Sequence, residues 1–395
     1  KLHKGPDGIR YIKVDVRKDK DSLDKIMYSD VHLVNLFISK ASKDGTGIMA
    51  EFCKIDFSLH KKSPSEVPMF RHLVQKSKGC QELRYRVKLS QIATMARAFD
   101  LYAKQQPDPL DVEVLDMPGV VFHESRCGST LVANSLIAMK PKEHRVYSES
   151  SPPIQAIRGV CGEDYTTCEM DLAVKLLKDT VYLMRRSADV GFEERVFFKF
   201  QSISTRNIAV FRQAFPDTPF VFVYREPVEV LMSQLKMGAK NANCVRPKRG
   251  PQGELMQHLL EEHDFSSTRE MSDEDYCAAH LASITESALS AIEQAPGLGM
   301  AVNYADLPKL LHEEIFPKHF GLEVGPQEVQ RIEQVCSVYS KGAGNKGGEF
   351  HEDSEEKKKN ATPAMREAAK KFLQKSYEKL EMHKTVPIRT KVSAR

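Results

Sequence analysis

The sequence predicts an α/β protein with three layers, a P-loop-type fold in which helices flank a central parallel sheet. From about residue 110 onward, apolar runs of strand length alternate with helical patterns, which is typical of βαβ units. Two of these runs lead through a short turn into a helix, as phosphate-binding loops do. At 395 residues, the chain is long enough for one large domain or two smaller ones.

The elements expected after residue 110 follow one another in a regular order. Short runs rich in apolar and β-branched residues predict strands at 119–123, 145–148, 195–200, 219–224 and 299–303. Patterns of helical period predict helices at 129–139, 170–187, 204–214, 227–237, 252–263, 273–295, 306–317 and 363–382. This alternation indicates a parallel sheet with helical crossovers.

The first 110 residues differ in character and carry no recognisable motif. They hold mixed-charge stretches, a hydrophobic run at 32–38 and a helical pattern at 89–102. Breaker residues at 105–109 indicate a linker. We therefore divide the chain into an N-terminal extension of unknown role, 1–110, and a nucleotide-binding domain, 111–395. We expect the extension either to shape a ligand pocket or to mediate contacts.

The first strand-to-turn-to-helix segment has the features of an anion cradle. An apolar run at 120–122 precedes a Gly-containing turn, and a helical pattern follows from residue 129. Free N–H groups and the helix dipole attract an anion, Arg126 adds a positive charge, and two hydroxyl side chains add donors. The Walker pattern G-x-x-x-x-G-K-[ST] is absent, so an ordinary ATPase or GTPase loop is not supported.

The second segment repeats this layout. A strand at 220–224 ends at Arg225, and Pro227 then opens a helix, where its missing N–H costs nothing. Ser233 follows Arg225 by eight residues, about two helical turns. Ligands of open α/β sheets bind at the carboxyl ends of the strands. We therefore expect both turns to converge on one ligand that has two anionic ends.

Together these segments resemble the sulfotransferase family that uses 3′-phosphoadenosine 5′-phosphosulfate (PAPS). The turn resembles the family's 5′-phosphosulfate loop through Ser125, Arg126, Cys127, Gly128, Ser129, Thr130 and Leu131. Arg225 and Ser233 resemble its 3′-phosphate clamp. A looser match at 339–350, with Lys341 and Gly342, resembles the loop that closes over the nucleotide. Residues 303–307 resemble the tyrosine–acid–leucine sequence that follows a late strand in this family. The resemblance covers about residues 115–385.

The resemblance implies transfer of the sulfuryl group of PAPS to a hydroxyl or amine by in-line displacement, with 3′-phosphoadenosine 5′-phosphate (PAP) as product and no metal. Arg126 is then expected to contact the sulfonate and the leaving group. Glu149 lies 23 residues after Arg126, where tyrosylprotein sulfotransferases have a glutamate base. The cytosolic branch has a base histidine where this chain has Gln201 or Ser202. We predict Glu149 as the base; the alternative is a helix-capping or loop carboxylate.

Two further polar residues have two interpretations each. Lys199 lies on an apolar strand, where an unpaired ammonium is costly. It is predicted either to contact the sulfonate or acceptor, as a catalytic residue, or to pair with a core carboxylate. His123 is either a polar group of the site or a packed histidine whose nitrogens are satisfied.

Charge and composition set limits on partners and compartment. The net charge of +4 does not by itself argue for nucleic acid, and no apolar run approaches the length of a membrane span. The basic stretch 236–250 is either a solvated mobile loop or a lid on an anionic acceptor. The acceptor stays unknown, with a weak preference for a carbohydrate or other anionic alcohol. Because the chain starts at Lys1, we expect loss of an N-terminal segment, and the compartment stays open between the cytoplasm and the secretory lumen, such as the Golgi.

Eight cysteines are scattered along the chain without a C-x-x-C pair, so a zinc site is not expected. Cys161 and Cys168 are expected to be bridged only if the protein matures in a secretory lumen; otherwise the cysteines are predicted to be reduced, unrelated thiols.

Two alternative functions remain open from the sequence. A small-molecule or nucleotide kinase of P-loop type shares the strand–loop–helix geometry, but it would need a Walker lysine and a magnesium-binding carboxylate. A catalytically inactive scaffold would bind PAP without turnover, and the missing histidine gives this alternative its weight.

Overall fold

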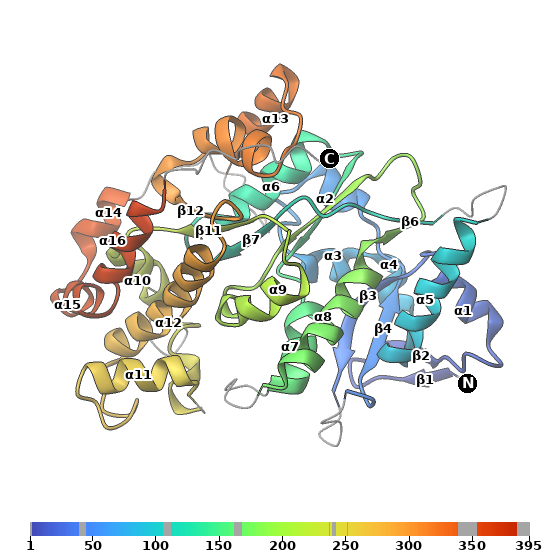
Figure 1. Cartoon of the computed structure of the whole chain (residues 1–395), viewed down its shortest axis with the longest axis horizontal. Helices are drawn as coiled ribbons and strands as arrows, with labels where there is room; N and C mark the ends of the chain where they lie inside the picture. Colours follow the sequence, from blue (N-terminus) through green and yellow to red (C-terminus); the bar gives the residue numbers. More distant parts are fainter. Residues whose placement is uncertain are drawn as a thin grey trace.

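Two five-stranded sheets organise the chain (Figure 1). The computed structural model describes residues 2–38, 45–105, 112–161, 168–236, 238, 242–250, 252–338 and 354–384. The larger part of the chain surrounds a parallel sheet with strand order β12-β11-β7-β10-β8. Its strands are β7 (Val120–His123), β8 (His144–Ser148), β10 (Arg195–Lys199), β11 (Phe220–Tyr224) and β12 (Gly299–Asn303). Each lies within about one residue of its predicted position.

Side chains of the parallel sheet alternate between two apolar clusters, one on each face. Val121 and Val223 belong to one cluster, whereas Val120 and Phe122 belong to the other. Helices α6 (Ser129–Met139) and α13 (Pro326–Cys336) and the π-helical segment η5 (Leu311–His319) contribute to the first cluster. Helices α8 (Met170–Arg185), α9 (Ile208–Ala214) and α12 (Asp273–Gln294) contribute to the second. The predicted α/β fold, a central parallel sheet flanked by helices, is confirmed.

The first hundred residues form a second sheet, which the sequence did not predict. Its strand order is β1-β2-β5-β4-β3, and only the β2–β5 pair is parallel. The strands are β1 (Leu2–Lys4), β2 (Arg10–Lys13), β3 (His32–Phe37), β4 (Met49–Cys53) and β5 (Leu83–Lys88). The helices between and after them are α1 (Lys20–Met27), α2 (Ser58–Lys62), α3 (Phe70–Lys76), α4 (Lys78–Glu82) and α5 (Leu89–Ala103).

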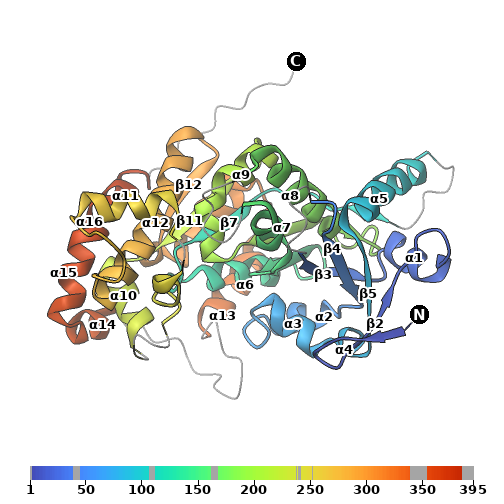
Figure 2. The same ribbon diagram turned by 90° about the horizontal axis from the view of Figure 1, so that it is seen from below.

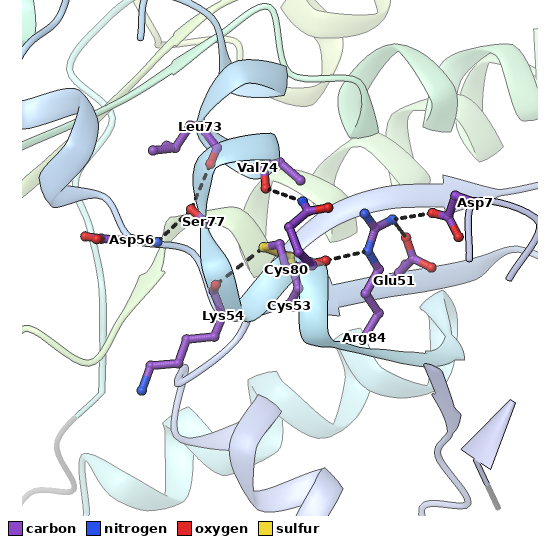
Figure 3. The surroundings of a disulfide bond; sticks show 11 residues. Asp7, Glu51, Cys53, Lys54, Asp56, Leu73, Val74, Ser77, Cys80 and Arg84 are labelled. Carbon is purple, nitrogen blue, oxygen red and sulfur yellow. Dashed lines mark hydrogen bonds and ion pairs between the residues drawn. A yellow bond between two sulfur atoms is a disulfide. The ribbon is translucent and has the colours of Figure 1, made fainter. Parts of the chain in front are cut away.

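A disulfide holds this sheet to one of its helices, and a charged cluster joins two of its strands (Figure 3). The Cys53–Cys80 disulfide joins the end of β4 to α4. Arg84 and Arg86 of β5 both donate to the buried carboxylate of Glu51, at 2.9 and 2.7 Å. Because Glu51 is fully buried, these two partners offset the cost of removing its charge from water.

The remaining helices differ from prediction at several points. Helix α7 (Pro152–Cys161) was missed because its two leading prolines resemble breakers, although proline is tolerated in a first helical turn. Helix α13 was also missed, and the helix expected at 306–317 is displaced to η5. The helix expected from Pro363 is interrupted at Leu373. The other elements are β6 (Glu113–Val114), β9 (Arg186–Ser187), α10 (Pro227–Leu235), α11 (Glu254–Glu262), η1 (Ser202–Asn207), η3 (Arg246–Arg249), η4 (Tyr304–Asp306), α14 (Ser354–Asn360), α15 (Pro363–Phe372) and α16 (Gln374–Met382).

The two sheets share one hydrophobic core. Apolar side chains of β3, β4 and β5 belong to the same cluster as those of α7 and α8. Figures 1 and 2 both place β3 beside α7 and α8. Most of the expected linker at 105–109 lies outside the described residues, and the division at residue 110 stays a prediction. In the structure, the first hundred residues are packed against the parallel-sheet region as part of one body.

Buried ion pairs cross this contact. Glu193, before β10, accepts hydrogen bonds from Lys61 of α2, at 2.6 Å, and from Arg145 of β8. Burial favours the neutral form of Glu193, but Arg145 and Lys61 outweigh it and lower its pKa to about 2. Arg186 donates to Asp100 at the end of α5, at 2.7 and 2.8 Å. The first hundred residues are therefore tied to the parallel-sheet region by desolvated charges as well as by apolar contacts.

Glu193→Ala is expected to lower the free energy of unfolding by about 3–5 kcal/mol, because it leaves the buried Arg145 guanidinium without its carboxylate. Urea denaturation of the whole chain measures this. The matched control is Glu194→Ala, since Glu194 is 53% exposed and its pairing with Arg195 is a surface contact. Equal unfolding midpoints for the two variants would contradict the role given to Glu193.

Candidate functional site

Three neighbouring strands of the parallel sheet end beside one large cavity. The cavity has a volume of about 780 Å³. The cavity is lined by residues 123–126 at the end of β7 and after it, by Glu149 after β8, and by Gln201 and Ser202 after β10. In parallel sheets the carboxyl ends of the strands are where ligands bind. The structure therefore brings the predicted residues Ser125, Arg126 and Glu149 together at one cavity.

The turn between β7 and α6 has the backbone of an anion-binding loop. Ser125, Arg126 and Gly128 all have positive φ, at 83°, 56° and 84°. Left-handed residues in a turn can direct neighbouring N–H groups toward a common concavity that favours anions. Position 128 requires glycine, because a Cβ there would lie 2.3 Å from the ring of Tyr304. The loop leads directly into α6, whose first-turn residues are Ser129, Thr130 and Leu131.

Cys127 fixes the loop to the neighbouring strand. Its thiol is buried and donates to the carbonyl of Val223 in β11, at 3.0 Å. Burial raises the pKa of the thiol to about 12. The thiol is therefore neutral, and the residue acts as a small packed group within the loop.

Lys199 and Glu149 form an ion pair at the cavity. The Lys199 side chain is 1% exposed, and its Nζ donates to Glu149 Oε1 and lies 3.5 Å from Thr130 Oγ1. Glu149 has a φ of 55°, and its own N–H donates to the Lys199 carbonyl at 2.7 Å. Lys199 thus pairs with a carboxylate, as one interpretation of the sequence required, and that carboxylate is the predicted base. The pair lies between the cavity and the first turn of α6.

His123 is a packed histidine with both ring nitrogens engaged. Its Nδ1 accepts from the Ser125 N–H at 3.0 Å, and its Nε2 donates to the Phe200 carbonyl at 3.0 Å. This arrangement corresponds to the neutral tautomer protonated on Nε2. The same Nε2 lies 3.8 Å from Glu149 Oε1. His123 therefore positions the loop and borders the ion pair.

Arg225 is linked to the same loop through Tyr304. The guanidinium is 4.1 Å from the ring centre of Tyr304, the residue that also packs on Gly128. Arg225 is buried and bonded to Glu229, which is also 3.4 Å from Lys358 of α14. Ser233 is buried on α10, the helix that follows Arg225. Neither Arg225 nor Ser233 lines the 780 Å³ cavity, so the predicted clamp is not part of the cavity wall.

Glu124 is a site residue that the sequence analysis missed. Its side chain is 4% exposed, lines the cavity and accepts the Arg225 N–H at 2.6 Å, which joins the two predicted anion loops. Burial raises its pKa to about 8. The sequence signal that could have identified Glu124 is a carboxyl group placed directly after a buried strand and beside an anion-binding loop. Because it is neutral at pH 7, this carboxyl does not repel an anion.

Two predicted nucleotide-binding residues lie outside the described residues, and the described residues show neither a metal-binding cluster nor a membrane-spanning helix. Lys341 and Gly342 fall within 339–353, which are not among the described residues. Across the described ranges, no group of three or more His, Cys, Asp and Glu side chains is arranged to hold a metal ion. None of the helices in the described ranges is long and apolar enough to cross a membrane.

The prediction of reduced, unrelated thiols was wrong for six of the eight cysteines, whereas the alternative Cys161–Cys168 bridge is present. Six cysteines form the pairs Cys53–Cys80, Cys161–Cys168 and Cys244–Cys277. Spacing along the chain did not reveal two of these pairs, because their members are 27 and 33 residues apart and meet only in the fold. The pair at 244 and 277 joins the basic stretch to α12.

The described part of the basic stretch is held in place rather than solvated along its whole length. Besides the disulfide, Lys248 donates to the Met271 carbonyl at 2.8 Å and to Asp273 at 2.7 Å. Thr268 donates to the Lys248 carbonyl at 2.8 Å. Residues Asn243, Cys244, Arg246 and Pro247 of this stretch line the cavity. The stretch therefore forms part of the cavity wall.

No family model and no curated protein sequence matches the chain. Similar solved structures include the sulfotransferase domain from the curacin biosynthetic pathway, at 12% identity and a TM-score of 0.35, covering 65% of this chain and 98% of that chain. Sulfotransferase STF9 from Mycobacterium avium is 13% identical, with a TM-score of 0.35 over 76% of this chain and 88% of that chain. The sulfotransferase domain of the Synechococcus PCC 7002 olefin synthase is 12% identical, with a TM-score of 0.36 over 68% and 95%. At these values the likeness carries no argument about activity, which has to come from the site.

In the wild type, the free energy of unfolding is expected to fall as the pH rises from 5 to 8, and Glu124→Gln is expected to make this fall smaller. Between its unfolded pKa of about 4.5 and its folded pKa of about 8, the folded chain holds a proton that the unfolded chain has lost. The free energy of unfolding of the wild type therefore falls across this window. Glutamine keeps an acceptor for the Arg225 N–H and removes the titration.

Thermal unfolding at several pH values measures this difference. Glu194→Gln is the control, because Glu194 is exposed, and it should keep the slope of the wild type. Parallel pH profiles for Glu124→Gln and the wild type would show that this carboxyl does not hold a proton in the folded protein.

Proposed function

We propose that the protein is a sulfotransferase that moves the sulfuryl group of PAPS to a hydroxyl or amine acceptor by in-line displacement. The observation that supports this most is the convergence of the Lys199–Glu149 pair with the anion loop at the edge of one cavity. Such a site offers a base, a cation and N–H donors to a reaction that moves an anionic group. Resemblance of 125–131 to the family's phosphosulfate loop points to the same chemistry.

Each residue has a distinct task in the proposed reaction. Glu149 accepts the acceptor proton while the acceptor oxygen or nitrogen bonds to sulfur. The bond from sulfur to the bridging oxygen of PAP breaks, and PAP leaves with the electron pair. Arg126, Lys199 and the loop N–H groups stabilise negative charge on the equatorial and leaving oxygens. The Lys199 ammonium lies between Glu149 and the first turn of α6, so it is close both to the proposed base and to the loop that would hold the sulfuryl group.

The 3′-phosphate of the nucleotide is proposed to bind at Arg225 and Ser233. In the structure, the Arg225 guanidinium is bonded to Glu229. A phosphate arriving at Arg225 would therefore compete with this carboxylate, and Lys358 offers Glu229 a second cationic partner. Tyr304 would couple the two nucleotide sites, because its ring contacts both the guanidinium and Gly128.

The double variant Arg225→Ala/Glu229→Gln is expected to weaken PAP binding by about 2–5 kcal/mol, since it removes one partner of a desolvated charge pair. Calorimetric titration with PAP measures this, with ATP–magnesium titrated alongside. The double variant also removes the charge of the buried Glu229 carboxylate, which Arg225→Ala alone would deprive of its Arg225 partner.

Glu229→Gln alone is the matched control and should bind PAP at least as tightly as the wild type, because a competitor of the phosphate has lost its charge. Equal PAP affinity in the wild type and the double variant would remove the clamp assignment. Binding of ATP–magnesium but not PAP by the wild type would favour the kinase alternative instead.

Glu149→Gln is expected to keep PAP affinity and to lower turnover by about 100- to 10,000-fold, the usual contribution of a general base. Glutamine keeps an oxygen acceptor for Lys199 but does not take up the proton. PAP release from PAPS, with a panel of alcohol, phenol and carbohydrate acceptors, measures turnover.

Gln201→Ala and Ser202→Ala are the controls, because these residues line the cavity where the cytosolic branch has its histidine. Both should keep most of the activity. Full activity of Glu149→Gln would place the base elsewhere. PAP binding by a wild type that turns over none of the acceptors would favour the inactive scaffold.

We also propose that the protein matures in an oxidising compartment. Three disulfides occur in the described part of the chain, and such bonds persist in secretory and extracellular environments. This favours the secretory lumen over the cytoplasm among the compartments that the sequence left open. Thiol labelling of the protein purified from its native source measures how many cysteines are free.

A further inference from the structure

The cavity has a second set of lining residues beyond the edge of the parallel sheet. Pro68, Met69, Arg71 and His72 come from α3 and the turn before it, and Arg158 comes from α7. Arg246 comes from the stretch 242–250. Three guanidinium groups from three separate segments therefore line the part of the cavity that is not built by the anion loop.

These cations have few counter-charges in the cavity lining. The only carboxyl groups among the described lining residues are Glu124 and Glu149. Glu149 is paired with Lys199, and Glu124 holds a proton at pH 7. A histidine is either neutral or positively charged, so the lining histidines cannot neutralise an arginine. Burial lowers the pKa of one of them, His280, to about 3. The described lining residues therefore carry a net positive charge.

Two of the arginines are presented to the cavity by well-anchored segments. Arg71 lies in the first turn of α3, and Arg246 lies two residues after the disulfide-bonded Cys244. Within the described ranges, no ion pair of the Arg71 or Arg246 side chain is present, whereas Arg158 has a partner. A guanidinium held at a cavity wall is suited to planar anionic groups such as carboxylate and sulfate, which it can bind through two hydrogen bonds.

Building on the sulfuryl transfer proposed above, we infer that the acceptor is an anionic alcohol with two or more carboxylate or sulfate groups. Arg71 and Arg246 bind these groups, while the hydroxyl that receives the sulfuryl group lies at Glu149. The sulfuryl group, the leaving PAP and the anions of the acceptor are thus held by different cations of the same site. The first hundred residues contribute Arg71 and so take part in acceptor recognition.

Three hexasaccharide probes test the charge preference. Maltohexaose is neutral, hexagalacturonate carries carboxylates, and sulfated maltohexaose carries sulfates. Each is titrated calorimetrically into PAP-loaded protein, and again into nucleotide-free protein. We expect at least one anionic probe to bind tenfold or more tightly than maltohexaose in both titrations. If neither anionic probe exceeds maltohexaose, the inference is wrong.

The variant Arg71→Ala/Arg246→Ala locates the binding. It should lose tenfold or more of the affinity for the anionic probe and keep the PAP affinity of the wild type. Arg17→Ala is the control, because Arg17 is exposed and does not line the cavity. An unchanged probe affinity in the double variant would overturn the assignment of Arg71 and Arg246.

The two proposals fail in different ways. A protein that binds the anionic probe at these arginines but does not bind PAP refutes the sulfotransferase function while leaving an anion-binding cavity. A protein that binds PAP but prefers maltohexaose refutes the anionic acceptor alone. Circular dichroism of each variant confirms that the fold is kept, and both arginines are exposed, so their removal should not disturb it.

Discussion

The parallel pairing of β7 with β10 on one side and β11 on the other is the constraint on which the candidate site depends. Register along these strands fixes His123 opposite Val223 and Lys199 opposite Val121. Because all five strands run in the same direction, their polar continuations emerge at one edge. Elsewhere along the strands, side chains are buried on both faces. The polar side chains of the candidate site therefore gather at the carboxyl edge of this sheet.

Charge compensation at that edge is local and specific. Lys199, one of the most buried lysines, is stabilised by Glu149, and Arg225 by Glu229. Each pair combines a cation suited to an anionic ligand with a carboxylate that holds the cation when the ligand is absent. Removal of either partner would leave a desolvated charge, so each pair is retained as a unit. The charges of these two buried cations are thus compensated by carboxylates of the protein rather than by water.

The parallel sheet could be predicted from the sequence, whereas the N-terminal sheet could not. Strands such as 220–224 are continuous apolar runs, because both faces of a parallel strand are buried, and such runs stand out. The strands at 10–13 and 83–88 are short, carry arginines and lysines, and pair across more than 70 residues. Their polar pattern is explained only by partners such as Glu51, which no local pattern reveals.

The same division applies to the site. Ser125, Arg126 and Gly128 could be predicted because a short turn carries the whole anion-binding pattern. The role of Glu124 was missed because it depends on burial and on the N–H of Arg225, 101 residues away. Arg71 and Arg158 were missed for a similar reason, because the segments that carry them meet the sheet edge only in the folded chain.

The walls of the cavity come from stretches of sequence that are far apart. The wall at the sheet edge consists of the loops after β7, β8 and β10, and the remainder comes from α3, α7 and the stretch 242–250. Substitutions in α3 or in 242–250 reshape the cavity without touching the loop that precedes α6. The shape and charge of the cavity can therefore be altered from these distant segments while the backbone of the sheet edge stays as it is.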